Sequence, residues 1–261
     1  MTTWRLAVVG SPVEHSLSPQ LHAAGLRAYG LTGSSTRVDM GSGRVEDLRA
    51  LMGARFDAVS VTMPLKGDAL RVADRIEQVA AECESVNSLR WRGGSVEANS
   101  TDGEGLLSAL GAQWRLSVDG IHAVVLGAGG AASAVVGALV RAGVSSIAVH
   151  GRSEERVARL VRRYPNVVDH MVIYRPVDLI VNTIPVDSRT PSAAVMQGVT
   201  HDTAAVDIVY EPRESEWLAQ HRALGCAGMN GLPMLAHQAA AQMRWWWGGD
   251  LDGESLLGEI L

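Results

Sequence analysis

The stretch Val124-Val125-Leu126-Gly127-Ala128-Gly129-Gly130-Ala131-Ala132 joins an apolar run to a segment with helical spacing. It fits the pattern G-x-G-x-x-G/A, with Gly127, Gly129 and Ala132 at the three small positions. The first glycine makes a tight turn, the second lets the backbone approach a pyrophosphate, and the third small residue lets the helix pack on the strand. The helix N-terminus offers unpaired N–H groups to the anion. The stretch predicts a dinucleotide-binding site; the alternative is a tight turn without a ligand.

The end of the next predicted strand indicates which dinucleotide is bound. NAD enzymes usually place Asp or Glu there, where it binds the ribose 2′-OH. Here Val149 is followed by His150-Gly151-Arg152-Ser153, and the first acid is Glu154. Arg152 can pair with a 2′-phosphate and Ser153 can add a hydrogen bond, so the pattern favours NADP. The alternative is that Arg152 is solvated and Ser153 only caps the following helix.

Apolar runs alternate with helical patterns along the whole chain, which predicts an α/β fold with parallel strands. The predicted strands are 5–9, 36–40, 58–62, 88–91, 96–99, 122–126, 146–150, 177–182, 204–208 and 226–229. The predicted helices are 19–29, 45–52, 75–84, 103–110, 131–142, 154–163, 215–224, 233–246 and 254–260. A candidate strand over 167–174 leaves no room for a crossover helix before 177–182. The second series of strands is therefore expected to be trimmed, or to have an irregular third strand.

Composition excludes several classes of protein. The 261 residues are 47% hydrophobic and 20% charged, which is typical of a globular protein with one large or two modest domains. The formal charge of −5 leaves no electrostatic footprint for nucleic acid or an anionic membrane. No apolar run approaches the ~20 residues that span a bilayer.

Only Cys83 and Cys226 are present, so we expect no disulfide framework and a cytoplasmic location. The histidines form no metal-binding motif, so no metal is expected.

Lys66 is the only lysine, in Val61-Thr62-Met63-Pro64-Leu65-Lys66. A buried lysine can shift its pKa and move a proton, whereas arginine stays charged. A surface lysine that carries no function is an equally good interpretation of the sequence alone.

Other motifs have a structural and a functional interpretation. Ser18 and Pro19 suit the N-cap and first position of a helix, while Ser16 and Ser18 together could hold a carboxylate. Asp102 could cap the helix that follows it. The run Trp245-Trp246-Trp247 predicts an aromatic seam rather than a ligand cage, because the three rings cannot all point one way.

Taken together, these motifs resemble the shikimate dehydrogenase family, and the resemblance covers nearly the whole chain. It is carried by Ser16-Leu17-Ser18-Pro19-Gln20-Leu21-His22, Val61-Thr62-Met63-Pro64-Leu65-Lys66, Val86-Asn87, Thr101-Asp102-Gly103, the glycine turn with Arg152, Asn182-Thr183, Asp207-Ile208-Val209-Tyr210 and Gly231-Leu232-Pro233-Met234-Leu235-Ala236-His237-Gln238-Ala239. Each motif is short, but their order and spacing together are specific.

The resemblance implies two domains with the active site in the cleft between them. Residues 1–101 and 233–261 would form an α/β substrate-binding domain, to which the C-terminal helices return, and residues 102–232 a Rossmann-like NADP-binding domain. The implied reaction is reversible hydride transfer between shikimate and NADP, giving 3-dehydroshikimate, on the pathway to chorismate and the aromatic amino acids. A cytoplasmic enzyme is implied, without nucleic acid or membrane partners; a homodimer is compatible with the sequence.

The resemblance also assigns residues. Substrate would be bound by Ser16, Ser18, Thr62, Lys66, Asn87, Asp102, Tyr210 and Gln238. The cofactor would be bound by Gly127, Ala128, Gly129, Gly130, Ala131, Arg152, Ser153, Ile208, Gly231 and Met234. Because hydride can leave an alcohol only if the hydroxyl proton leaves too, the site needs a proton acceptor. We expect Lys66 to be that acid/base and Asp102 its partner, and the reverse assignment stays open.

Several departures from the family pattern leave alternatives open. Ala23, Ser100 and Gly151 stand where the family often has Asn, and Pro233 begins the last motif's helix. The short 164–178 segment leaves the adenine side of the cofactor site undefined. Alternatives are a quinate or aminoshikimate dehydrogenase, or a catalytically silent NADP-binding regulator on the same scaffold.

Overall fold

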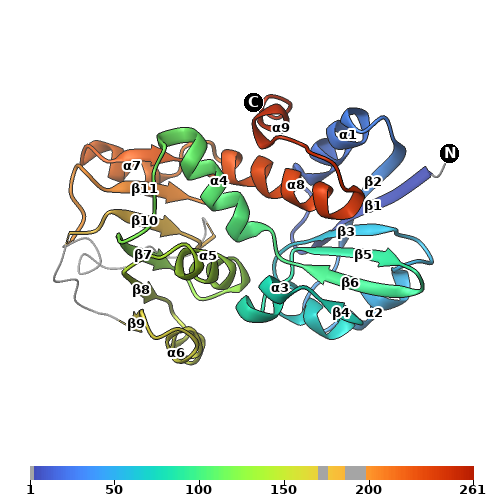
Figure 1. The fold of residues 1–261 in the computed structure, drawn as a ribbon, viewed down its shortest axis with the longest axis horizontal. Coiled ribbons are helices and arrows are strands. Elements are labelled where there is room, and N and C mark those ends of the chain that lie inside the picture. Colours follow the sequence, from blue (N-terminus) through green and yellow to red (C-terminus); the bar gives the residue numbers. More distant parts are fainter. Residues whose placement is uncertain (1–2, 170–175, 186–197) are drawn as a thin grey trace. The chain divides into compact units, whose positions relative to one another are not determined.

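The computed structural model describes residues 3–169, 176–185 and 198–261. The chain divides into two compact units. Unit 1 is Met1–Leu106 with Ala236–Leu261, and unit 2 is Leu107–Leu235. In the described residues each unit is built on a six-stranded sheet (Figure 1).

Unit 2 contains the glycine-rich turn and a fully parallel sheet. Its elements are β7 (His122–Leu126), α5 (Gly130–Arg141), β8 (Ser146–His150), α6 (Glu154–Arg163), β9 (Val167–Asp169), β10 (Leu179–Asn182), β11 (Ala204–Asp207), α7 (Glu216–Ala223) and β12 (Ala227–Met229). The strands lie in the order β12-β11-β10-β7-β8-β9. This is the doubly wound order of a Rossmann fold, whose switch point lies between the first and fourth strands, here β7 and β10.

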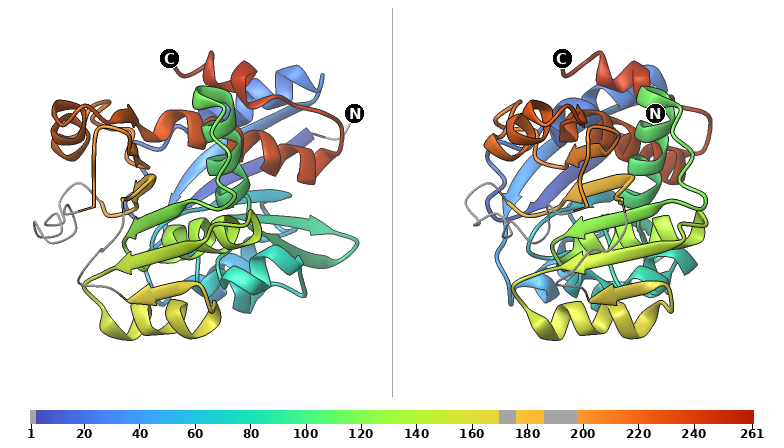
Figure 2. Two further views of the ribbon diagram at one scale, coloured as in Figure 1. Left: turned by 60° about the vertical axis from the view of Figure 1, so that its left-hand side comes forward. Right: turned by 90° about the vertical axis from the view of Figure 1, so that its left-hand side faces the viewer.

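The central strands β7, β10 and β11 of unit 2 are buried on both faces, which is why they read as apolar runs in the sequence. Val124 and Leu126 of β7 belong to a core cluster with Trp217 and Leu218 of α7. The alternate residues of β7 are also buried, and α5 packs against that strand. The helix α6 (yellow) lies along β9 in both views of Figure 2. The Rossmann-like prediction is confirmed.

The third strand of this sheet, β9, is described over three residues. It pairs in parallel with β8. The candidate strand 167–174 therefore begins where predicted, and its remainder lies outside the described residues.

Unit 1 has a mixed sheet in the order β2-β1-β3-β5-β6-β4. Its elements are β1 (Thr3–Gly10), α1 (Ser18–Ala28), β2 (Thr32–Asp39), α2 (Val45–Leu51), β3 (Ala58–Val61), the 3₁₀ helix η1 (Asp68–Val72), β4 (Arg75–Ile76), α3 (Gln78–Cys83), β5 (Ser88–Arg92), β6 (Ser95–Asn99), the start of α4 (Asp102–Trp114), the end of α8 (Gly231–Trp247) and α9 (Gly253–Leu257). Strand β5 runs antiparallel to both neighbours.

Two local predictions in unit 1 are wrong. The predicted helix 75–84 is a short strand, β4, followed by α3, because Arg75 and Ile76 pair with β6 instead of joining the helix. Ser18 is not the N-cap of α1 but its first residue, and Leu17 occupies the cap without a side-chain hydrogen bond. The Ser16 hydroxyl donates to that of Ser18 at 3.2 Å.

The C-terminal helices belong to unit 1, as predicted, and the tryptophan run forms the predicted seam. Trp247 packs against Trp4, with ring centroids 5.7 Å apart, and against Tyr29 at 5.3 Å. Trp245 instead lies under the Arg90 guanidinium, 4.1 Å from it. Trp246 packs on the His22 ring at 5.3 Å, so each of the three rings contacts a different part of unit 1.

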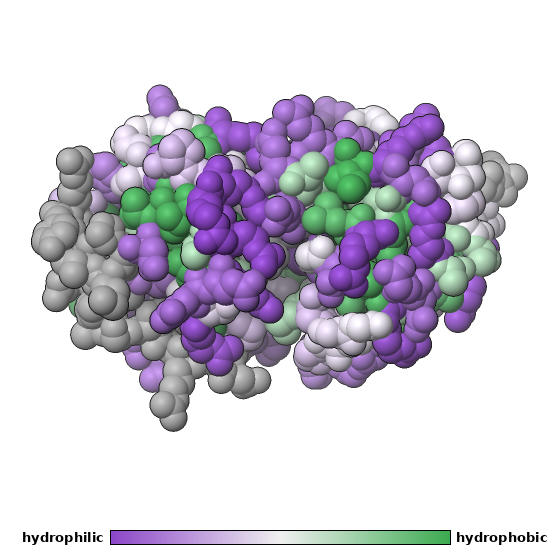
Figure 3. Space-filling view, turned by 90° about the horizontal axis from the view of Figure 1, so that it is seen from below, coloured by the Kyte–Doolittle hydropathy of each residue, from purple (hydrophilic) through white to green (hydrophobic). Residues whose placement is uncertain are grey.

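Among the helices of the described segments, none has the length and hydropathy needed to cross a membrane. On the face drawn in Figure 3, hydrophilic side chains (purple) separate smaller groups of hydrophobic ones (green).

His22 of α1 is a buried polar residue in the core of unit 1. Its Nδ1 lies 2.7 Å from the Ser35 hydroxyl and its Nε2 lies 2.8 Å from the Ser60 hydroxyl. Burial lowers the pKa of His22 to about 3, since a charged imidazole would lose its hydration there. The imidazole is therefore neutral in the folded protein at ordinary pH.

We predict that His22 makes folding acid-sensitive. Below pH ~6.5 the unfolded chain binds a proton at His22 that the folded state excludes, so stability falls by about 1.4 kcal/mol per pH unit toward pH 3. Urea unfolding followed by tryptophan fluorescence at pH 7.5 and 5 measures this. His22→Gln should lose about 2 kcal/mol less over that range. His221, whose pKa burial also lowers, is present in both proteins and cancels. Equal losses in the two proteins would contradict the prediction.

Candidate functional site

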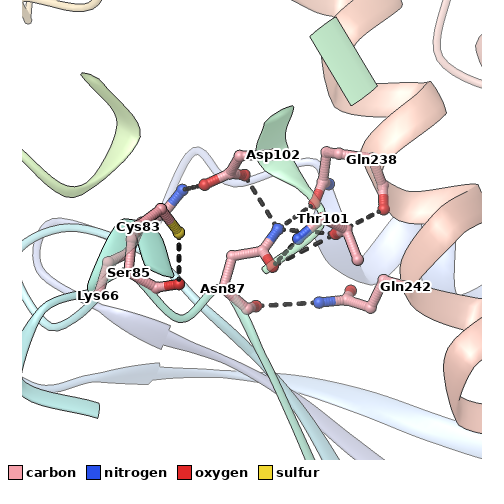
Figure 4. A network of polar contacts seen from close by, with 8 residues as sticks. All are labelled: Lys66, Cys83, Ser85, Asn87, Thr101, Asp102, Gln238 and Gln242. Carbon is pink, nitrogen blue, oxygen red and sulfur yellow. Dashed lines mark hydrogen bonds and ion pairs between the residues drawn. The ribbon is translucent and has the colours of Figure 1, made fainter. Parts of the chain in front are cut away.

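The structure brings Lys66 and Asp102 together within unit 1. Lys66 Nζ donates to Asp102 Oδ2 at 2.5 Å, although the residues are 36 positions apart (Figure 4). Their side chains are 17% and 6% exposed. Asp102 is the first residue of α4, where the helix dipole also favours a carboxylate. The pair combines a partly accessible amine with a buried carboxylate, which is an arrangement that can exchange a proton with a bound ligand.

The turn that carries Lys66 is fixed from both sides. It follows β3, and Leu65 is fully buried beneath it. The Lys66 carbonyl accepts from Val86 N at 2.8 Å, which ties the turn to the segment before β5. Thr62, at the end of β3, is half-buried at the start of the same turn. The lysine therefore projects from an anchored backbone.

Asn87 holds the other oxygen of the Asp102 carboxylate. Its side-chain nitrogen donates to Asp102 Oδ1 at 2.9 Å and to Gln238 Oε1 at 2.8 Å, and lies 2.9 Å from Thr101 Oγ1. Its side-chain oxygen accepts from the Thr101 N–H at 2.8 Å. Because a backbone N–H can only donate, this last bond determines which end of the amide faces Thr101. The amide N–H groups must then face Asp102 and Gln238.

Helix α8 approaches α4 closely beside this group. A Cβ added at Gly105 of α4 would lie 2.5 Å from the Gln238 Cβ and 2.7 Å from the Gln238 backbone nitrogen. Thr101 Oγ1 also donates to the Gln238 carbonyl at 3.0 Å. The absence of a side chain at Gly105 thus lets Gln238 reach Asn87.

Ser16 and Ser18 lie at the start of α1. Ser18 is buried and Ser16 is half-buried, and the Ser16 carbonyl accepts from Arg37 Nη2 at 2.7 Å. Among the described residues, neither hydroxyl is hydrogen-bonded to the Lys66–Asp102 pair. Tyr210 is half-buried in unit 2, just after β11.

The glycine-rich turn adopts the geometry that its sequence predicts. Gly127 follows β7 with φ +112°, a conformation that disfavours other residues, and an added Cβ would lie 2.2 Å from Thr183 Oγ1. Ala132 is fully buried, so α5 packs closely on the sheet. By contrast, nothing lies within 4 Å of a Cβ added at Gly129, the N-cap of α5. The helix N-terminus, with Gly130 and Ala131 in its first turn, is open to an anion on this side.

Arg152 and Ser153 lie at the end of β8. Arg152 is exposed and has no hydrogen-bond partner among the described residues, so its guanidinium N–H groups are available to donate to a ligand. Ser153 caps α6 by accepting from Arg156 N at 3.4 Å, so the capping alternative holds for this residue. Gly151, just before Arg152, approaches Ala128 of the glycine-rich turn: a Cβ added at Gly151 would be 3.2 Å from the Ala128 Cβ.

The remaining predicted cofactor residues lie around the end of β11. Ile208 N donates to the Asn182 carbonyl at 3.0 Å, and Gly231 N to the Val209 carbonyl at 2.9 Å. Met234 is buried on the first turns of α8. The Asp207 carboxylate accepts from Asn182, Val209 and Ser215, and burial raises its pKa. This carboxylate therefore organises the loops that carry Ile208 and Gly231.

Comparisons with known proteins agree on one family. The family model described as "Shikimate dehydrogenase substrate binding domain" matches residues 8–89, and the one described as "Shikimate / quinate 5-dehydrogenase" matches residues 110–185. A shikimate dehydrogenase (NADP(+)) of Thermus thermophilus is 36% identical over 250 residues, covering 94% of this chain and 92% of the relative. The chain belongs to the shikimate dehydrogenase family. The resemblance predicted from the motifs is confirmed.

Other family members match this chain over nearly its whole length. A relative of the same name from Roseobacter denitrificans is 34% identical over 254 residues, covering 92% of this chain and 91% of the relative. The Thermus thermophilus enzyme solved in complex with NADP(H) and shikimate has a TM-score of 0.85 at 34% identity, covering 98% of each chain. The fold and family therefore extend over both units.

The motifs did not single out three residues of the polar network in this family member. Gln242 Nε2 donates to the Asn87 carbonyl at 2.9 Å, and Ser60 Oγ donates to Gln242 Oε1 at 2.6 Å. Thr101 was quoted in a motif but given no role. One signal was available for Gln242, which stands four residues after Gln238 in an otherwise apolar part of the helix.

We predict that Gly105→Ala separates α4 from α8. The added methyl group meets the Gln238 backbone, so overpacking should lower the free energy of unfolding by about 1–3 kcal/mol. Gly111→Ala is the matched control on the same helix, since nothing lies within 4 Å of its added Cβ. Thermal unfolding of the two variants compares them. A Gly105→Ala protein as stable as Gly111→Ala would show that the approach is not tight.

Proposed function

We propose that this protein is an NADP-dependent shikimate dehydrogenase, which reversibly transfers a hydride between shikimate and NADP and forms 3-dehydroshikimate in the oxidative direction. In this proposal unit 1 binds shikimate and unit 2 binds NADP. The observation that carries it is the Lys66–Asp102 pair, held by Asn87, in a chain whose relatives bear this name. The reaction places the enzyme on the route to chorismate.

The chemistry requires one proton and one hydride to leave the same carbinol group. NADP, when bound, accepts the hydride on its nicotinamide ring. Lys66 takes the proton from the hydroxyl at Nζ, and Asp102 orients the amine and balances the charge that it gains. In the reverse direction the ammonium of Lys66 returns the proton to the carbonyl oxygen. Thr62, Asn87 and Gln238 bind ring hydroxyls, and Ser16, Ser18 and Tyr210 bind the carboxylate.

The residues of unit 2 fit NADP. The open space at Gly129 and the N-terminus of α5 suit a pyrophosphate, as described above. The exposed Arg152 suits the 2′-phosphate, with Ser153 beside it. Gly127, Ala128, Gly130 and Ala131 form the turn, and Ile208, Gly231 and Met234 would line the rest of the cofactor site.

We predict that the purified protein reduces NADP with shikimate, and that Lys66→Ala lowers kcat by about 10²–10⁴-fold, with a much smaller rise in KM, because the proton acceptor is lost. Lys66→Arg keeps the positive charge beside Asp102 but removes the titratable amine, so it should be similarly slow. NADPH absorbance measures both.

Arg71→Ala is the control for these variants, since Arg71 is an exposed neighbour in sequence. Near-normal kcat in Lys66→Ala would end the assignment of Lys66. Turnover of quinate but not shikimate by the wild type would replace the proposed substrate.

We predict that Arg152 selects the cofactor. Arg152→Ala should raise KM for NADP about 10–100-fold, because a charge-assisted pair with the 2′-phosphate is lost, and should change KM for NAD little. Arg159→Ala, on the exposed side of α6, is the control. Equal effects on the two cofactors would remove Arg152 from the 2′-phosphate site.

The proposed location is the cytoplasm. Cys83 and Cys226 are both buried thiols rather than disulfide partners, which agrees with a reducing compartment. The proposed partners are shikimate and NADP without nucleic acid, and sedimentation equilibrium tests the homodimer that the sequence allows.

A further inference from the structure

Helix α8 contacts Asn87 at two points. Gln238, Gln242 and Trp246 follow at intervals of four residues, so they lie on one face of the helix. Gln238 Oε1 accepts from the Asn87 side chain at 2.8 Å, and Gln242 Nε2 donates to the Asn87 carbonyl at 2.9 Å (Figure 4). One turn later, Trp246 packs on the His22 ring with centroids 5.3 Å apart. The helix thus holds both the side chain and the peptide of Asn87.

A chain of hydrogen bonds lies behind Gln242. Ser60 Oγ donates its one hydrogen to Gln242 Oε1 at 2.6 Å, so it accepts from His22 Nε2 at 2.8 Å. His22 therefore carries its proton on Nε2, and its Nδ1 accepts from the Ser35 hydroxyl at 2.7 Å. With these directions, each hydrogen bond in the chain pairs one donor with one acceptor. The chain runs from Ser35 through His22, Ser60 and Gln242 to the Asn87 carbonyl.

Beyond the half-buried Ser35, this chain lies away from solvent. His22 and Gln242 are fully buried, and Ser60 is 7% exposed. Polar groups in such surroundings are costly to leave without partners, so the chain has one satisfied arrangement. In that arrangement the Gln242 amide N–H faces Asn87 and cannot turn over without breaking the bond from Ser60.

We propose that Gln242, fixed by Ser60 and His22, is a positioning residue that restrains the Asn87 peptide. The side-chain amide of Asn87, which the Thr101 N–H orients, then holds the Asp102 carboxylate that pairs with Lys66 in place. The inference deepens the proposed function and rests on it. Gln242 is not a catalytic residue, because it acts only through Asn87.

Gln242 is the second of two donors to the Asn87 carbonyl. Val61 N already donates to the Asn87 carbonyl at 2.7 Å, which keeps the segment beside β3. Asn87 N also donates to the Asn99 carbonyl at 3.2 Å, so both bonds hold the segment from the side of the sheet. Gln242 restrains the same peptide from α8, and a tilt of this peptide would move the side-chain amide that Asp102 accepts from. Small displacements of a reacting group reduce the rate strongly.

The test compares Gln242→Met, which keeps the volume but removes both hydrogen bonds, with Val45→Ala, which removes core methyl groups from α2 and leaves every bond of the chain intact. We expect Gln242→Met to lower kcat about 10–100-fold relative to Val45→Ala, with KM for shikimate changed less than about threefold. Its affinity for NADPH, measured by fluorescence, should equal that of the wild type. Ser60→Ala should lower kcat in the same way, and the double variant Ser60→Ala/Gln242→Met should be no slower than Gln242→Met.

A second readout does not depend on turnover. The Asn87 side-chain amide signals in ¹H–¹⁵N spectra should shift or broaden in Gln242→Met and stay unchanged in Val45→Ala. A kcat for Gln242→Met within about twofold of Val45→Ala, or multiplicative losses in the double variant, would overturn the inference. If the wild type fails to oxidise shikimate, the proposed function fails instead, and unchanged Asn87 signals would then reject the positioning role separately.

Discussion

The bond between Lys66 and Asp102 is the interaction on which the site of unit 1 depends. A carboxylate that is 6% exposed must have each oxygen bound, because burying a charge without partners is costly. One oxygen accepts from Lys66 and the other from Asn87. The amide of Asn87 is in turn oriented by a backbone N–H, which cannot reverse its role. The geometry of the pair is therefore set by groups that have no alternative arrangement.

The two units build their candidate sites by different means. Unit 2 relies on backbone, with a glycine at positive φ, a helix N-terminus and strand ends that meet at a switch point. Unit 1 relies on side chains that converge from α4, α8 and the segment before β5. Backbone N–H groups at a turn and a helix N-terminus suit a phosphate, because several of these donors point at the same anion. Side chains suit a ring of hydroxyl groups, which must be distinguished from one another.

This difference explains what the sequence could predict. Strands β7 and β8 were predicted at their observed bounds, because each contains a continuous apolar run, residues 123–126 in β7 and residues 147–149 in β8. Strand β4 was missed, because two residues at a sheet edge produce no periodic pattern. The candidate pair was predicted from family motifs, whereas the role of Asn87 in holding it needed coordinates. The buried chain from His22 to Gln242 was missed because its members come from distant segments, and each alone looks like an ordinary polar residue in a core.

The lone lysine has a practical consequence for chemistry on the intact protein. Besides its terminal amine, the chain offers an acylating or reductively methylating reagent a single side-chain target, and that target is 17% exposed and bonded to Asp102. Mass spectrometry of the labelled protein then measures how much of Lys66 has reacted, because no other lysine contributes to the signal. The rate at which the Lys66 adduct forms, with and without ligands, becomes a direct gauge of how accessible the amine is.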